Sequence, residues 1–145
     1  MSSANLDLVR SIYAAWERGD YRVVEWADAD IDFVIVDGPE PGSWTGLAGM
    51  VEGGRTILDP WEGWRPEAEE YRELDEERIL VLTRRRGRGR TSELEIGRLG
   101  TGGASLFHIR YGKVTRHFVY WDRAQALADL GLPPSTGSSG SSPRG

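Results

Sequence analysis

The two histidines of the chain, His108 and His117, are its first candidates for chemistry. An imidazole in an apolar pocket can exchange protons near neutral pH, as general acid–base catalysis requires. His117 is therefore the leading candidate catalytic residue, and His108 could complete a pair. The alternative is that His117 is a core histidine hydrogen-bonded to a neighbouring hydroxyl group.

A predicted β-hairpin positions both histidines. Two strand-like runs flank Tyr111-Gly112, and glycine supplies the positive φ that a tight hairpin turn needs. If Arg110 pairs with Lys113, alternation of side chains places both histidines on one face. That face is predicted to hold Leu106, His108, Thr115, His117, Val119 and Trp121. The opposite, more apolar face is predicted to hold Phe107, Ile109, Val114, Phe118 and Tyr120.

Asp32 is the candidate catalytic carboxylate, in a predicted strand over residues 31–36. We expect it to share one internal cavity with His117 and Trp121. The alternative is a solvated strand position, because a single acid on a strand is often only exposed. Asp37, just before Gly38, is more typical of a turn.

The tryptophans could form a site for a flat aromatic or polycyclic ligand, or they could simply fill a core. The chain has six of them, which is many for its length. The candidate ligand-binding residues are Trp16, Trp44, His108, Val119 and Trp121, with Trp61 and Trp64 as further possible lining.

The composition and the motifs of the sequence exclude or disfavour several classes of functional site. The chain of 145 residues has no cysteine, which excludes disulfides and thiolate chemistry. With only two histidines, a zinc site would need carboxylates from elsewhere, so we expect no metal. No phosphate loop, dinucleotide fingerprint or nucleophile elbow occurs, and we expect no cofactor.

Charge and hydropathy bear on partners. A net charge of −5 disfavours nucleic acid, although five arginines gather between Arg84 and Arg90. That cluster is typical of a solvated strand end, because no aromatic residue interleaves it. No run is long and apolar enough for a membrane span and no signal-peptide pattern is present, so we expect a cytoplasmic protein without a membrane partner.

The spacing of apolar residues predicts helices first and strands afterwards. Residues 5–18 form an amphipathic helix, Asp20 caps a shorter helix, and residues 47–58 form a third. Strands are expected over residues 67–74, 78–86, 92–110 and 113–121, and Asp122 caps a closing helix. Such segregated elements predict an α+β fold with helices on a mostly antiparallel sheet. We expect one domain over residues 1–132 and a disordered Ser/Gly-rich tail over residues 133–145.

The chain resembles the SnoaL-like branch of the nuclear-transport-factor-2-like (NTF2-like) superfamily over roughly residues 5–132. The resemblance lies in the first helix ending Trp16-Glu17-Arg18-Gly19-Asp20, and in the closing Gly112-Lys113-Val114 and Val119-Tyr120-Trp121-Asp122. It implies a cone-shaped α+β barrel, in which a strongly curved sheet wraps on helices around an apolar pocket, commonly as a homodimer.

The catalytic residues of two related families are mostly missing. Ketosteroid-isomerase-like members place a carboxylate and a phenol at positions that correspond here to Val34 and Ile12. Tyr13 is one position off, or roughly 100° around the helix. Limonene-epoxide-hydrolase-like members need an Arg-x-Asp and a last-strand carboxylate, and only Arg78 remains, because Leu80 and Val119 occupy the acid positions.

Two function classes remain. One is a cofactor-independent isomerase, cyclase or hydratase that acts on an apolar or polycyclic small molecule. The other is a non-catalytic small-molecule-binding or dimerisation module. An enzyme should bring a carboxylate or a histidine pair into the pocket, whereas a binder needs only apolar walls. We also expect a homodimer through the sheet face that carries Phe107, Ile109, Phe118 and Tyr120, because that face is too apolar for water.

Overall fold

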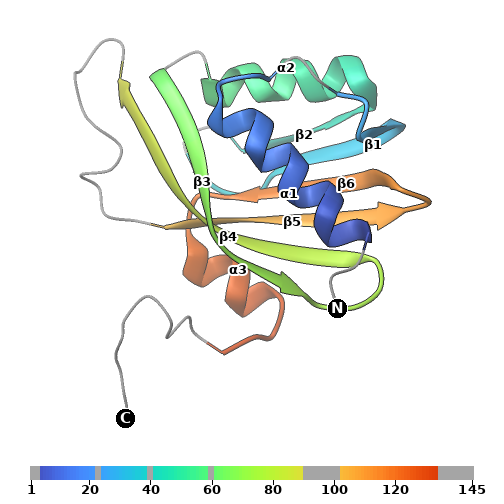
Figure 1. The fold of residues 1–145 in the computed structure, drawn as a ribbon. Helices are drawn as coiled ribbons and strands as arrows, with labels where there is room; N and C mark the ends of the chain where they lie inside the picture. Colours follow the sequence, from blue (N-terminus) through green and yellow to red (C-terminus); the bar gives the residue numbers. More distant parts are fainter. Residues whose placement is uncertain (1–3, 22–23, 39–40, 59–60, 90–101, 134–145) are drawn as a thin grey trace.

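A computed structural model of the protein describes residues 4–21, 24–38, 41–58, 61–89 and 102–133. The side chains of residues 61–65 and 85–89 lie outside this description. The described chain holds three helices and six strands (Figure 1). The helices are α1 (Ala4–Glu17), α2 (Gly46–Leu58) and α3 (Arg123–Asp129). The strands are β1 (Ala27–Ile35), β2 (Gly42–Thr45), β3 (Trp61–Glu73), β4 (Arg78–Gly89), β5 (Gly103–Arg110) and β6 (Lys113–Tyr120).

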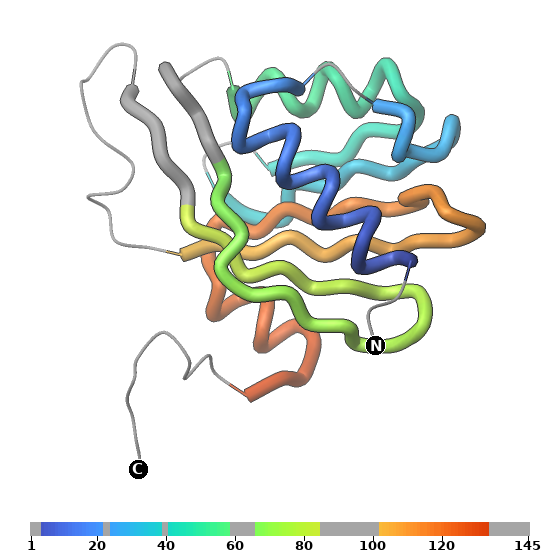
Figure 2. Tube along the Cα trace, viewed as in Figure 1, coloured from blue at the N-terminus to red at the C-terminus, as the bar shows by residue number. Residues whose placement is uncertain are grey.

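The strands form one sheet in the order β2-β1-β6-β5-β4-β3. Every neighbouring pair is antiparallel except β1 and β6, which run parallel. The sheet curves around α1, and α2 lies beside α1 on the same side (Figures 1 and 2). The predicted α+β fold with helices on a mostly antiparallel sheet is therefore confirmed.

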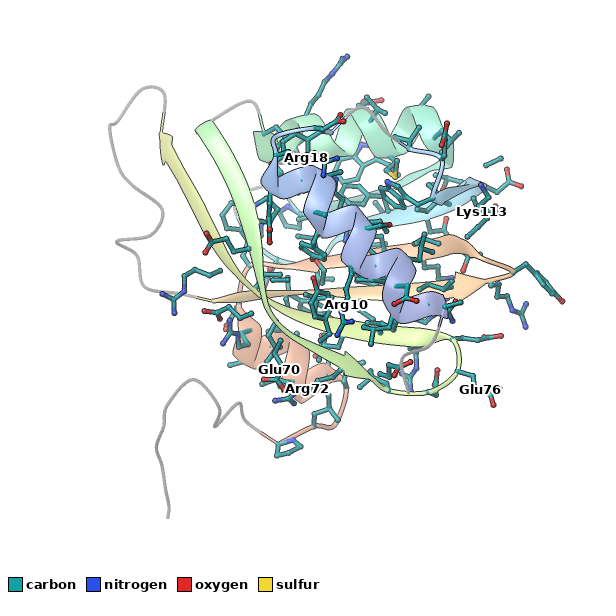
Figure 3. All side chains as sticks on the ribbon, in the orientation of Figure 1. Arg10, Arg18, Glu70, Arg72, Glu76 and Lys113 are labelled. Carbon is teal, nitrogen blue, oxygen red and sulfur yellow. The ribbon has the colours of Figure 1, made fainter. Side chains whose placement is uncertain are left out.

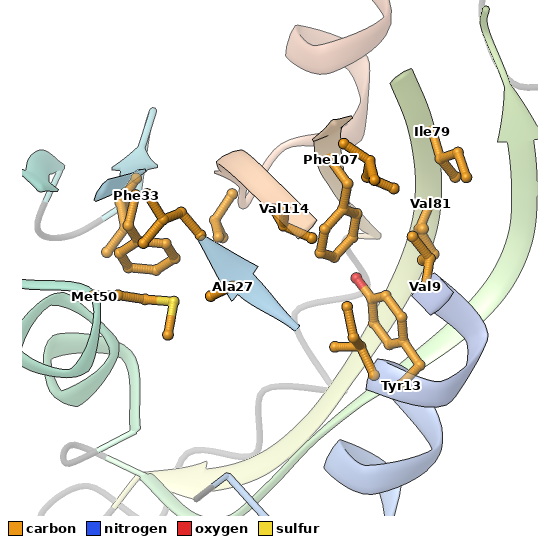
Figure 4. Packing of buried hydrophobic residues seen from close by; sticks show 14 of the residues in the cluster. Val9, Tyr13, Ala27, Phe33, Met50, Ile79, Val81, Phe107 and Val114 are labelled. Atoms are coloured by element: carbon orange, nitrogen blue, oxygen red, sulfur yellow. The ribbon is translucent and has the colours of Figure 1, made fainter. Parts of the chain in front are cut away.

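The main core lies between the inner face of the sheet and α1 and α2 (Figure 4). α1 turns Val9, Ile12 and Tyr13 inward, and each is at most 2% exposed. Tyr13 meets Phe107 of β5 edge to face, with ring centroids 6.0 Å apart. The first helix is thus anchored by the apolar stripe that its sequence predicted.

A second, smaller core lies on the outer face of the sheet under α3. Asp122 caps this helix, as predicted, by accepting a hydrogen bond from the backbone N–H of Ala124 at 3.0 Å. The buried members of this second core are Leu80, Leu82, Ala104, Leu106, Tyr120, Ala126 and Leu127. Helices therefore cover both faces of the sheet, because α3 packs on the face opposite α1 and α2.

The β5–β6 hairpin turns at Tyr111 and Gly112, as predicted, and both have positive φ (52° and 74°). The register then shifts, because Ile109 pairs with Val114 but His108 pairs with Arg116. Thr115 is the extra residue, a β-bulge that reverses the alternation of side chains beyond it. The predicted face assignment is consequently wrong: His117 lies with Phe107 on the inner face, and His108 lies on the outer face.

Two local expectations also fail. Residues 25–26 form a turn and β1 begins at Ala27, so the described residues between Asp20 and β1 form no helix. β2, which was not predicted, pairs with β1.

The segment 90–101 and nearly all of the expected tail lie outside the described residues. None of the helices within the described chain has the length and hydropathy to cross a bilayer.

Charged side chains mark the periphery of the molecule (Figure 3). Glu70 and Arg72 form an ion pair on β3, with Oε2 and Nε 2.6 Å apart. Lys113, at the start of β6, donates from Nζ to the backbone oxygen of Glu25. That contact and the hydrogen bond from Val114 N–H to the Trp26 carbonyl (2.8 Å) hold the segment before β1 against β6.

Candidate functional site

A cavity of about 290 Å³ lies between α1, α2 and the inner face of the sheet. Aromatic and aliphatic side chains make up most of its described wall. The lining comprises Tyr13, Trp16, Tyr21, Val24, Trp26, Phe33, Met50, Val51, Gly54, Arg55, Ile57, Leu58, Pro66, Thr83, Ser105, His117 and Val119. Such a wall suits a small apolar ligand.

His117 lies in this wall and is only 4% exposed. Its ring stacks on Phe107 at a centroid distance of 4.4 Å and an interplanar angle of 12°. Trp16 stacks on it less closely, at 5.9 Å and 24°. The Nε2 atom is buried and has no hydrogen-bond partner among the described residues. Buried polar atoms are nearly always paired, so this atom points to a missing partner.

Burial sets the protonation state of His117. Desolvation of the imidazolium lowers the pKa of His117 from 6.5 to about 3. The ring is therefore neutral at physiological pH. A neutral imidazole can donate or accept one hydrogen bond at Nε2, but with so low a pKa it is a weak base.

Aromatic rings from α1, β1 and the segment between them build much of the described wall around this imidazole. Trp16 of α1 stacks on Tyr21 at 6.4 Å and 26°, and meets Trp26 edge to face at 5.9 Å. Phe33 of β1 lies 5.4 Å from the His117 ring. The α1 spacing directs Trp16 inward, and the parallel pairing of β1 with β6 brings Trp26 and Phe33 to the same place. The site therefore offers aromatic faces to a flat ligand.

The polar part of the described lining is small. Thr83 and Ser105 are 2% and 6% exposed, and Tyr13 adds a phenol. Arg55 is the one charged residue, and no described lining residue is acidic. Among the described residues, no group of three metal-ligating side chains occurs. This part of the wall can thus hold a ligand by stacking and by a few hydrogen bonds.

Three predicted site residues, Trp16, His117 and Val119, do line the cavity. Asp32 does not, because it projects from the outer face of β1 between the buried Ile31 and Phe33. There it accepts a hydrogen bond from Thr45 Oγ1 at 3.2 Å and lies 3.7 Å from Arg116 Nε. The expectation that Asp32 and His117 share one cavity is wrong.

His108 is also separated from the cavity by the sheet. Its ring lies 5.5 Å from that of Phe118 on the outer face. Burial lowers its pKa, and the nearby guanidinium groups of Arg116 and Arg78 lower it further. The expected pair of histidines does not form, because the bulge at Thr115 places the two rings on opposite faces.

Two predicted tryptophans pack beside the cavity instead of lining it. Trp44 of β2 lies against Phe33, with centroids 5.9 Å apart, and against the glycines of α2. The Trp121 ring packs over Gly38, and the backbone N–H of Trp121 donates to Asp37 Oδ1 at 2.5 Å. Neither is among the described lining residues. The side chains of Trp61 and Trp64 lie outside the described residues.

Sequence reasoning missed Tyr21, Trp26, Phe33 and Arg55. The alternation of Ile31, Phe33 and Ile35 could have identified Phe33 as inward-facing and Asp32 as outward-facing. Trp26 could not be found in this way, because its position depends on pairing with a strand about 90 residues later. Arg55 carried no signal beyond its place in the last turn of a helix.

Several solved structures have a similar fold. An NTF2-like protein of unknown function from Burkholderia pseudomallei is 20% identical with a TM-score of 0.69, over 88% of this chain and 97% of that one. TerC, co-crystallised with polyporic acid, is 22% identical with a TM-score of 0.66, over 88% and 98%. A protein with a ketosteroid isomerase-like fold from Catenulispora acidiphila, in complex with trimethylamine, is 16% identical with a TM-score of 0.64, over 88% and 94%.

No protein-family model and no curated protein matches the sequence. The structural similarities extend over most of both chains in each case, at identities that establish the fold alone. They agree with the α+β fold of three helices on one mostly antiparallel sheet. The chain therefore has the NTF2-like fold, as its sequence resemblance predicted.

Proposed function

We propose that the protein binds a small planar aromatic compound in the cavity, with a polar group of the ligand hydrogen-bonded to His117 Nε2. The observation that carries this proposal is the buried Nε2 atom, which no described residue pairs with, in a wall that is mostly aromatic and aliphatic. An unpaired buried polar atom costs about 1–3 kcal/mol. A ligand that pairs with it recovers this free energy, whereas a phenylalanine would have filled the same space without the cost.

The cavity supports binding better than catalysis. An enzyme of the expected kind needs a carboxylate or a second imidazole close to His117. The described lining contains neither, since Asp32 and His108 lie on the outer face. A pKa of about 3 for His117 also limits its strength as a base.

A cofactor-independent isomerase, cyclase or hydratase is the second candidate, and Tyr13 favours it. The Tyr13 side chain lines the cavity and is 1% exposed, so a phenol from α1 does reach the site. Tyr13 and His117 together would supply a proton donor and an acceptor. If mass spectrometry shows that a bound compound is converted, and Tyr13→Phe stops conversion but not binding, the enzyme is the correct candidate.

Binding can be tested with a pair of probes that differ in one hydrogen-bonding group. Isothermal titration should show 2-naphthol binding about tenfold more tightly than 2-methylnaphthalene, because only the naphthol can pair with Nε2. His117→Phe should remove this preference. His108→Phe, on the outer face, is the matched control and should retain it. Failure of both probes to bind, or an unchanged preference in His117→Phe, would refute the proposal.

We also propose a homodimer through the outer face of the sheet. Of the residues expected on this face, Phe107 and Ile109 are buried on the inner face, and α3 covers Tyr120. Val34 and Phe118 remain, paired side by side on β1 and β6 and only partly buried. Sedimentation at micromolar concentration should give twice the chain mass of 16.2 kDa, and Phe118→Arg should give the monomer mass.

A further inference from the structure

We infer that the ligand of this cavity is an aromatic acid, whose anionic group is held at the mouth by Arg55. This inference rests on the proposed function and names the class of ligand. Arg55 lies in the last turn of α2, lines the cavity and is itself exposed. A cation at the rim of an aromatic cavity provides a place for one negative charge.

Arg55 differs from most arginines of the described chain in having no carboxylate partner. Its guanidinium makes no ion pair or hydrogen bond with another described residue, although the chain carries 23 acidic residues against 18 basic ones. By contrast, ion pairs within 4 Å engage Arg72, Arg78, Arg84, Arg110, Arg116 and Arg123. A cavity-lining arginine that no described carboxylate engages is available for an external anion.

The depth of the cavity determines where a ligand charge can lie. A charged group beside His117 would lose its hydration among aromatic rings, and the neutral imidazole could not compensate the cost. At Arg55 the same group stays partly hydrated and gains a guanidinium partner. The charge therefore belongs at the mouth and the ring system inside.

The volume limits the ring system. A cavity of about 290 Å³ lies at the small end of ligand pockets, which run from roughly 300 to 1,000 Å³. One ring or two fused rings suit this space, with a carboxylate or a similar anionic group at one edge. The C-terminal turn of α2 would favour a cation at this place even without a ligand. The test must therefore separate ligand recognition from helix stabilisation.

The experiment compares 2-naphthoate with 2-naphthamide, which has nearly the same shape but no charge. Titration at low ionic strength should show the naphthoate binding about fivefold more tightly to the wild-type protein, as expected for a partly exposed ion pair. Arg55→Gln should bind the two equally, with its affinity for the amide unchanged. Arg55→Lys should keep part of the preference. Arg110→Gln, on the β5–β6 turn and outside the cavity lining, carries the same change in charge and should behave like wild type.

The outcomes separate the two proposals. If naphthoate and naphthamide bind wild type equally, or if Arg55→Gln keeps the preference, the aromatic-acid inference is wrong while the aromatic pocket stands. If neither binds but 2-naphthol does, again only this inference falls. If none of the three compounds binds, both are wrong. If Arg55→Gln lowers the melting temperature but leaves the ratio of the naphthoate and naphthamide affinities unchanged, Arg55 contributes only to the stability of the helix.

Discussion

The rings of His117 and Phe107 stack across the β5–β6 pair with their centroids 4.4 Å apart and their planes 12° from parallel. The imidazole is therefore held by packing, and its Nε2 atom contributes no hydrogen bond to the fold. A side chain held in this way can be replaced by another flat ring. The position thus allows the requirements of folding and of ligand binding to be tested apart.

His117→Phe should stabilise the protein while it weakens binding of hydrogen-bonding ligands. The substitution removes an unpaired buried nitrogen, and the expected gain in the free energy of unfolding is about 1 kcal/mol. His117→Ala, which leaves a cavity, should instead lose several kcal/mol. Urea unfolding of both variants provides the measurement. Destabilisation by the phenylalanine would mean that Nε2 is paired in the folded protein.

Acid should destabilise the protein partly through His117. Burial lowers the pKa of His117 from 6.5 to about 3, so between these values the unfolded chain binds a proton that the folded chain does not. Stability is then highest above pH 6.5 and falls with decreasing pH, by at most about 1.4 kcal/mol per pH unit from this group. Urea unfolding at pH 7, 6 and 5 should show a shallower loss for His117→Phe than for wild type. Equal slopes in the two proteins would contradict the lowered pKa.

Gly53 and Gly54 are adjacent in α2 but should respond in opposite ways to alanine. A Cβ on Gly53 would lie 2.6 Å from Trp44 Cε3 and 2.8 Å from Phe33 Cδ2, whereas a Cβ on Gly54 would meet nothing within 4 Å. We expect Gly53→Ala to cost about 1–3 kcal/mol by overpacking. Gly54→Ala should gain up to about 1 kcal/mol from helix propensity. Thermal unfolding of the two variants checks both, and equal effects would refute the packing of Trp44 on α2.

Arg123 should matter more for stability than an exposed arginine. Its Nη2 donates to Glu69 Oε1 at 2.6 Å and to the Thr83 carbonyl at 2.8 Å, which joins α3 to β3 and β4. The hydrogen bond from Arg123 is also the largest cause of the lowered pKa of Glu69. Arg123→Met should cost about 1–3 kcal/mol, because two charge-assisted hydrogen bonds are lost. Arg110→Met is the control, and a similar loss there would show that charge alone is responsible.

Local signals in the sequence predicted much of the fold. The apolar stripe of α1, the Tyr111-Gly112 turn and the Asp122 cap each depend on a few neighbouring residues, and each occurs where it was expected. β2 was missed because its four residues acquire their conformation by pairing with β1. The turn before β1 was interpreted as a helix because apolar spacing alone cannot distinguish the two over so short a segment.

The site was predicted less well, because it depends on pairing between distant strands. Of the residues predicted for the site, His117, Val119 and Trp16 line the cavity. The side-chain alternation that placed His108 and His117 on one face assumed a regular hairpin. No residue type near Thr115 indicates the bulge. Asp32 was assigned from its chemistry, although the alternation around it already favoured the outer face. Side-chain alternation within one strand therefore predicted the face of a residue better than alternation extended across a turn to the next strand.

The β-bulge at Thr115 makes the chemistry of the cavity depend on backbone register as well as on residue type. If Thr115 paired with His108 in a regular hairpin, Arg116 would lie opposite Phe107 and His117 opposite Leu106. The inner face would then receive a guanidinium in place of the neutral imidazole, although no side chain of the strand had been substituted. The bulge thus decides which side chains of β6 enter the cavity, and its loss with Thr115 retained would fit the same β6 sequence to a different class of ligand.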